Sequence, residues 1–193
     1  SIALVYLGWA VLGAISAVII ATLVAFLISI PSFLHIYKYD EEYIDKQDIY
    51  KYGINASLTI AFIFVILSAD IITAKIIFPE ELVGKYAVAS IIGKMIFFSI
   101  MPISKSMFPL ASEKEDSPEE AFNLLLKSIF IILFVSFFAL IIFLLLPELL
   151  IKILFGNLYI NISHLIFFTG LSFTMLSFSS LFLLYSLSQK RKI

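Results

Sequence analysis

The stretch VASIIGKMIFFSI, residues 88–100, decides the class of fold, because it reads as a membrane-spanning helix with one lysine inside it. A helix needs about 20 predominantly apolar residues to cross a bilayer core of about 30 Å. The apolar run around this stretch, from about Leu82 to Phe108, is long enough. An ammonium group at the centre of such a helix costs about 2.5–3.5 kcal/mol on insertion scales, so it usually faces a partner or a water-filled cavity. Lys94 therefore predicts an intramembrane ion pair or a polar cavity.

The composition of the whole chain agrees with a membrane protein. Of its 193 residues, 62% are hydrophobic and 14% are charged, and the net charge is -1. Soluble domains have about 45–50% apolar and about 25% charged residues. The lysines and arginines form no basic block or stripe, which excludes nucleic acid as a partner. The chain has no cysteine, and its histidines, His35 and His164, are isolated, so we expect no metal site and no cofactor.

Hydropathy predicts an all-α, polytopic transmembrane helix bundle with about five spans. The expected spans are about 13–32, 53–78, 82–108, 124–146 and 160–187. Pro79, Pro109 and Pro147 are expected to end spans. Ser117 and Pro118 predict the N-cap and first position of the helix that carries the fourth span. Residues 148–159 are too few to cross and predict a helix at the membrane interface.

A polar, tyrosine-rich segment, residues 35–52, separates the first span from the others. We therefore expect three parts, a first helix in residues 1–34, a linker in 35–52 and a second helical unit in 53–193. A cytoplasmic linker puts most basic residues inside and leaves only Lys75, Lys85 and Lys152 outside, as the positive-inside rule favours. The sequence thus predicts a multi-pass protein of the cell membrane with linker and C-terminus in the cytoplasm.

A second intramembrane charge, Asp70, lies in the neighbouring span. Asp70 is about 10 Å from the end of its span and Lys94 about 15 Å from the start of the next, a difference that a flexible lysine can bridge. In one interpretation the two form a pair that only lets both charges exist in lipid. In another they line a polar cavity, where Lys94 attracts an anionic substrate and Asp70 takes a coupling cation. In a third, Lys94 reaches the membrane surface without a partner.

Two further patterns concern helix packing. Pro102 lies inside the third expected span and predicts a kink. In the first span, small residues recur at every fourth position, namely Gly13, Ala17, Ala21, Ala25 and Ser29. Such a ridge lets another helix approach closely, so we expect this helix to pack against protein.

Common catalytic motifs do not occur in the sequence. The chain has no G-x-S-x-G, no P-loop and no H-E-x-x-H motif. A membrane-embedded glycan-transfer enzyme would need paired acids beside a soluble loop, whereas Asp70 stands alone. We therefore expect a protein that is not an enzyme.

Several stretches together resemble one known family. ILSADIITAKIIFPEELVGKYAVASIIGKMIFFSIMPISKSMFPLASE, residues 66–113, resembles the signature region of polysaccharide biosynthesis flippases in the multidrug/oligosaccharidyl-lipid/polysaccharide exporter superfamily. The matching points are Asp70, Gly84-x-Tyr86-x-Val88-Ala89, Pro102 and Phe108-Pro109. PELLIKILFGNLY (147–159) resembles the interfacial segment before the tenth helix of that family. LLYSLSQKRK (183–192) is similar to the turn after that helix, and YLGWAVLGAISAVIIATLVAFL (6–27) to the start of the sixth.

The resemblance implies a fold of twelve or more helices in two lobes. This chain would supply the last helix of the N-terminal lobe, the cytoplasmic linker and the first helices of an incomplete C-terminal lobe. It would then be part of a longer protein, with the missing lobe or a partner chain completing the transport path.

The resemblance also implies an activity, the translocation of a lipid-linked oligosaccharide to the outer leaflet by alternating access. Lys94 would bind the phosphate of the lipid carrier, and Asp70 would serve conformational or ion coupling. The implied partners are the lipid-linked oligosaccharide, membrane lipid and a coupling cation. Two alternatives stay open, a cation-coupled multidrug exporter of the same superfamily and a truncated or helper membrane subunit that does not transport.

Overall fold

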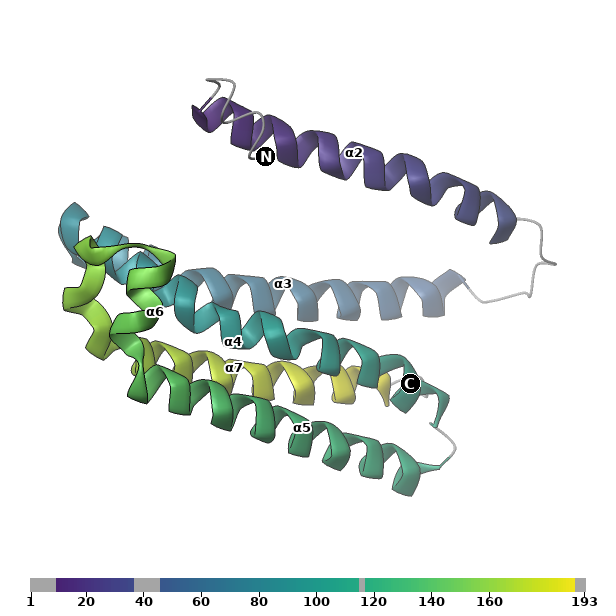
Figure 1. The fold of residues 1–193 in the computed structure, drawn as a ribbon. Helices are drawn as coiled ribbons and strands as arrows, with labels where there is room; N and C mark the ends of the chain where they lie inside the picture. Colours follow the sequence, from purple (N-terminus) through teal and green to yellow (C-terminus); the bar gives the residue numbers. More distant parts are fainter. Residues whose placement is uncertain (1–9, 37–45, 115–116, 190–193) are drawn as a thin grey trace. The chain divides into compact units, whose positions relative to one another are not determined.

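A computed structural model describes residues 10–36, 46–114 and 117–189, and all elements in these ranges are helices (Figure 1). They are α2 (Ala10–Ile36), α3 (Lys46–Ile77), α4 (Glu80–Glu113), α5 (Pro118–Leu145), α6 (Pro147–Leu154), the 3-10 helix η2 (Asn157–Ile162) and α7 (Ser163–Ser188). The chain divides into two compact units, residues 1–45 and residues 46–193. The all-α class predicted from the sequence is confirmed.

Four helical segments of the second unit are long and apolar enough to cross a membrane, namely Gly53–Ile77, Glu80–Glu113, Pro118–Leu145 and Asn157–Ser188. In α2, which belongs to the first unit, the described apolar part Ile15–Pro31 is shorter. Four of the five expected spans are thus confirmed, and the first, about 13–32, corresponds to α2. The segment predicted to form an interfacial helix contains α6, which ends at Leu154 before Gly156 turns the chain with a positive φ of 84°. Its place at the membrane interface stays a prediction.

Several helix boundaries differ from the sequence prediction because the helix continues. α2 runs to Ile36, two residues into the expected linker. α3 begins at Lys46, so residues 46–52 of the expected linker are helical, and this stretch has no proline to interrupt it. α4 continues through Pro102 and Pro109 to Glu113, so the prediction that Pro109 ends the span is wrong. A proline removes one helical hydrogen bond, and a membrane helix can continue past it when neighbouring groups satisfy the freed carbonyl.

Some of the sequence predictions concern residues or features that the described helices do not test. Residues 37–45 of the linker and the basic end 190–193 lie outside the described residues. The division of the chain between two lobes and the kink at Pro102 stay predictions. At the start of α5, Ser117 and Pro118 occupy the expected N-cap and first positions, although the Ser117 side chain makes no capping hydrogen bond.

An ion pair links the two ends of the connection between α4 and α5. Lys114 Nζ lies 2.5 Å from Glu120 Oε2. The hydrogen bond from this ammonium and the charge of Glu120 raise the pKa of Lys114. Both side chains are about half exposed, so this pair contributes little to stability.

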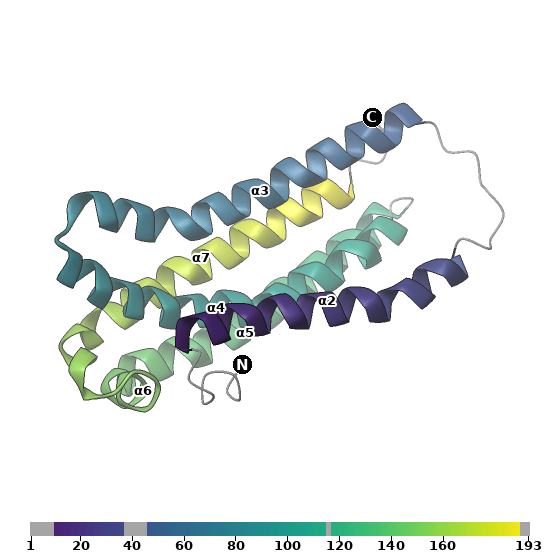
Figure 2. The ribbon, with the colours of Figure 1, turned by 90° about the horizontal axis from the view of Figure 1, so that it is seen from above.

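α4, α5 and α7 run side by side in the second unit, with α3 along α4 and α7 (Figures 1 and 2). α5 buries residues at a spacing of three, four or seven, so one narrow face meets the bundle: Ala121, Leu125, Ser128, Ile132, Ser136 and Phe143. Its other faces expose large apolar side chains such as Phe130 and Phe134. This pattern fits a helix with one face on protein and the others on lipid.

The most extensive contact between helices of the second unit is that of α4 with α7. A Cβ atom at Gly93 would lie 2.9 Å from the backbone carbon of Thr169. The Thr169 hydroxyl donates to the carbonyl oxygen of Ala89 at 3.0 Å. Gly170 lets α5 approach in the same way, because a Cβ there would lie 2.6 Å from the Phe143 ring. Small residues and hydrogen bonds between helices therefore supply the packing, as in other membrane bundles.

Gly93→Ala is expected to destabilise the protein, and Gly84→Ala provides the matched control. Both glycines lie in α4, so both changes gain the same helix propensity of about 1 kcal/mol. A methyl group at Gly84 meets nothing within 4 Å, whereas at Gly93 it meets the backbone of α7. Overpacking of this kind costs about 1–3 kcal/mol. Thermal unfolding of the two purified variants in detergent measures the difference, and equal melting temperatures would contradict the close approach of α4 and α7.

Candidate functional site

The structure brings together the two intramembrane charges of the sequence analysis. Lys94 Nζ lies 3.1 Å from Asp70 Oδ1, which joins α4 to α3. The side chains are 13% and 17% exposed, so water and lipid reach little of either. The Ser90 hydroxyl donates to the other carboxylate oxygen, Asp70 Oδ2. Ser90 and Lys94 are four residues apart on one face of α4, and this spacing lets both reach the same carboxylate.

α7 supplies the third side of this cluster. The ammonium of Lys94 lies 5.3 Å from the centre of the Phe173 ring, within the range of a cation–π contact. Phe173 also packs with Ile63 and Leu67 of α3 and with Phe97 of α4. The ion pair and this apolar cluster together attach α3 to the other helices.

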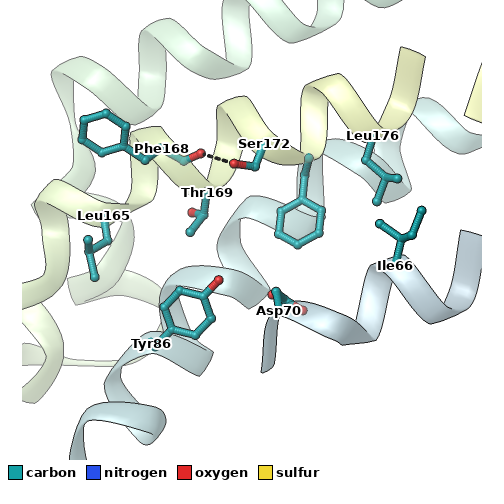
Figure 3. Close-up of a pocket in the computed structure, with 9 residues that line it drawn as sticks. Ile66, Asp70, Tyr86, Leu165, Phe168, Thr169, Ser172 and Leu176 are labelled. Carbon is teal, nitrogen blue, oxygen red and sulfur yellow. Dashed lines mark hydrogen bonds between the residues drawn. The ribbon is translucent and has the colours of Figure 1, made fainter. Parts of the chain in front are cut away.

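A pocket of about 380 Å³ lies beside the ion pair (Figure 3). Its lining residues come from three helices: Ile66 and Asp70 of α3, Tyr86 of α4, and Leu165, Phe168, Thr169, Ser172, Phe173 and Leu176 of α7. Asp70 lines the pocket and also binds Lys94, while Lys94 is not one of the lining residues. The carboxylate is thus the link between the ion pair and the pocket.

Hydroxyl groups supply the rest of the polar lining. The Thr169 hydroxyl donates to backbone carbonyls, and the Ser172 hydroxyl donates to the Phe168 carbonyl at 2.9 Å. Each oxygen keeps lone pairs that can accept a hydrogen bond. The Tyr86 hydroxyl points into the pocket between Asp70 and Thr169 (Figure 3). It makes no hydrogen bond to the part of the chain that the structure describes, so its proton is free to be donated.

A comparison with known protein families identifies the family of the chain. Residues 1–164 match the family described as polysaccharide biosynthesis protein. The chain belongs to this family. The match confirms the resemblance found in the sequence, and with the apolar helices it makes the chain a multi-pass membrane protein of polysaccharide biosynthesis. No curated protein and no solved structure matches the chain at a significant level.

Sequence analysis of this polysaccharide biosynthesis protein found Asp70 and Lys94 but missed most of their surroundings. The period of four from Tyr86 through Ser90 to Lys94 could have indicated that these residues share a face of α4. Thr169 and Phe173 come from a helix more than 70 positions further along the chain, and no local pattern connects them with Lys94.

The other predicted site residues are Pro102 of α4 and the small residues of α2. Pro102 is on an exposed face of α4. In α2, Ala17 is half-buried, Ala21 and Ala25 are exposed, and the surroundings of Gly13 are outside the described residues. Their role in helix packing stays a prediction. Among the described residues, no three His, Cys, Asp or Glu side chains are grouped so that they could hold a metal ion.

Breaking the ion pair from one side should destabilise the protein more than removing both charges. Lys94→Met leaves the carboxylate of Asp70 buried without its counter-ion, a loss of about 3–5 kcal/mol. We expect Asp70→Asn combined with Lys94→Met to be at least about 1 kcal/mol more stable than the sum of the single changes. Thermal or denaturant unfolding of the four proteins in detergent gives this coupling.

The exposed pair of Glu81 and Lys85 is the control for this cycle. Its atoms are 2.6 Å apart, but the Glu81 side chain is 81% exposed. Glu81→Gln and Lys85→Met should therefore show no measurable coupling. Additive effects at Asp70 and Lys94 as well would mean that their contact does not stabilise the fold.

Proposed function

We propose that the chain is part of a flippase that moves a lipid-linked oligosaccharide across the cell membrane by alternating access. The observation that carries this proposal is the ion pair between Asp70 and Lys94 beside a pocket, inside the membrane helices of a polysaccharide biosynthesis protein. Charged residues within membrane spans are expensive and commonly mark substrate pathways. A flippase also agrees with the absence of common catalytic motifs in the sequence.

Lys94 is proposed to bind the phosphate or pyrophosphate of the lipid carrier. Lysine presents a compact charge that binds phosphate without a rigid bidentate geometry, which suits a group that must also be released. In the described conformation, the carboxylate of Asp70 is the counter-ion of Lys94. A phosphate therefore has to displace the carboxylate, and the ammonium exchanges one counter-ion for another without ever being alone in the membrane.

Asp70 is proposed to couple this exchange to a change of conformation. Once Lys94 has turned to the phosphate, the carboxylate keeps Ser90 but loses its counter-ion. A cation or a proton can then neutralise it. Since Asp70 is also a major link between α3 and α4, its release would loosen α3 from the bundle.

The orientation and the division into lobes belong to the same proposal. We place the linker 35–52 and the C-terminus in the cytoplasm, as the distribution of basic residues favours. α2 is then the last helix of an N-terminal lobe, and α3 to α7 begin a C-terminal lobe. The rest of the transport path comes from a lobe or partner outside these 193 residues.

A cation-coupled multidrug exporter of the same superfamily is the second candidate, favoured by the position of Asp70 in the pocket lining. Such an exporter requires the acid and can dispense with the lysine, whereas phosphate binding requires the lysine. If the chain is a helper subunit that does not transport, translocation requires neither Asp70 nor Lys94.

Lys94→Ala is expected to abolish translocation of the lipid-linked oligosaccharide while leaving membrane insertion intact. The physical reason is the loss of the intramembrane charge that binds the carrier phosphate. In membranes of cells with the variant as their only copy, accessibility of the lipid-linked sugar to an external glycosidase measures translocation. Radiolabelled sugar transfer, measured in parallel, should stay normal and separates a flippase from a glycan-transfer enzyme.

Lys105→Ala is the matched control, because Lys105 is an exposed lysine in the same helix. We expect it to retain translocation. Normal translocation by Lys94→Ala would refute the proposed role of the lysine. Normal translocation by Lys94→Ala and Asp70→Asn together would favour the helper subunit.

A further inference from the structure

We propose that the pocket between α3, α4 and α7 binds an uncharged sugar ring, the part of the lipid-linked oligosaccharide next to the carrier phosphate. The inference rests on the proposed function and extends it, because it assigns the glycan to a place separate from Lys94. Four properties of the pocket carry it: its size, its charge, its hydrogen-bonding groups and its position beside the ion pair.

The size of the pocket fits a small ligand or one part of a larger one. Its volume of about 380 Å³ lies near the lower end of the range of about 300–1,000 Å³ for small-molecule sites. Most of the lining is apolar, supplied by Ile66, Leu165, Phe168, Phe173 and Leu176. The polar groups are those of Asp70, Tyr86, Thr169 and Ser172. A sugar ring has the same division, with C–H faces that pack on apolar or aromatic side chains and an edge of hydroxyl groups.

In the described conformation, with Asp70 and Lys94 paired, the charge of the pocket disfavours strongly charged ligands. An anion that entered would meet the carboxylate of Asp70, since Lys94 does not line the pocket. A cation would meet a carboxylate that Lys94 already neutralises at 3.1 Å. The lining therefore suits a polar group without net charge.

The hydrogen-bonding groups match the hydroxyls of a sugar, which both donate and accept. A carboxylate offers about four lone-pair sites, and Ser90 and Lys94 leave part of them free on Asp70. Thr169 and Ser172 have their protons engaged with backbone carbonyls and present acceptor lone pairs. The unengaged Tyr86 hydroxyl is a donor. One sugar ring could therefore find both donors and acceptors of hydrogen bonds in the pocket.

The position of the pocket fits the covalent structure of the substrate. In a lipid-linked oligosaccharide the first sugar is bonded directly to the carrier phosphate, so the two binding places must adjoin. Asp70 touches Lys94 and lines the pocket, which makes the proposed phosphate and sugar places neighbours. Ser172 is exposed at the pocket although it lies in a membrane-spanning helix. A polar group there is less costly beside water, protein or a sugar than against acyl chains.

Binding of two probes to the native protein in phosphatidylcholine nanodiscs tests the inference. One probe is a polyprenyl pyrophosphate that carries a disaccharide, and the other is the same polyprenyl pyrophosphate without sugar. Ser172→Leu fills the pocket, and Tyr86→Phe removes only the free donor. Ser179→Leu is the control, because Ser179 is an exposed serine two turns further along α7 that does not line the pocket.

We expect wild-type protein to bind the glycosylated probe about tenfold or more tightly than the bare one. Ser172→Leu and Tyr86→Phe should lose most of this preference and leave the Kd of the bare probe unchanged. Ser179→Leu should keep the preference. An unchanged preference in Ser172→Leu, or an equal loss of affinity for both probes, would overturn the assignment of the pocket to the sugar.

The outcomes separate this inference from the proposed function. If wild-type protein binds both probes with equal affinity and Lys94→Ala binds neither, the carrier is the ligand and only the sugar pocket is wrong. If wild-type protein binds neither probe, the proposed function fails and the sugar pocket fails with it.

Discussion

The cost of placing charge inside a bilayer is the constraint on which the second unit of this protein depends. Lys94 and Asp70 lie within helices that are otherwise apolar, and each charge is costly there without a counter-ion. Their contact also attaches α3, which buries few apolar residues against the other helices. Lipid tails are as apolar as leucine, so apolar contact alone gives little drive for helices to associate in a membrane. Among the described residues, the polar attachment of α3 to the bundle is Asp70 with its partners Lys94 and Ser90.

The packing of α4 on α7 gives this attachment a fixed base. Gly93 allows the two backbones to approach, and the hydrogen bond from Thr169 to the Ala89 carbonyl crosses between them. The same contacts set Thr169 and Phe173 opposite the face of α4 that carries Lys94. Small residues thus decide indirectly where the pocket lies and which side chains reach it.

The shared carboxylate of Asp70 connects the two proposed functions of the site. It is the counter-ion of the lysine proposed to bind phosphate and a lining group of the pocket proposed to bind sugar. A substrate that draws Lys94 away would change the charge of the pocket and weaken the hold on α3 in one step. In this proposal, substrate binding and helix movement act on the same pair of atoms.

The sequence by itself determined the class of the protein and its long apolar helices, and it offered the contact between Asp70 and Lys94 as one of three interpretations. Hydropathy acts on each stretch of about 20 residues separately, and two charges on adjacent spans have few other partners in lipid. The ends of helices were less predictable, because no local sequence pattern indicates that α3 begins before Gly53 or that α4 continues beyond Pro109. Only the tertiary structure decided that Tyr86, Ser90, Thr169 and Phe173 gather around this pair. Which faces of α4 and α7 meet depends on side-chain shape, above all on the absence of a Cβ at Gly93 and Gly170. These residues lie more than 70 positions apart, so no periodic pattern in the sequence indicates that the two faces fit together.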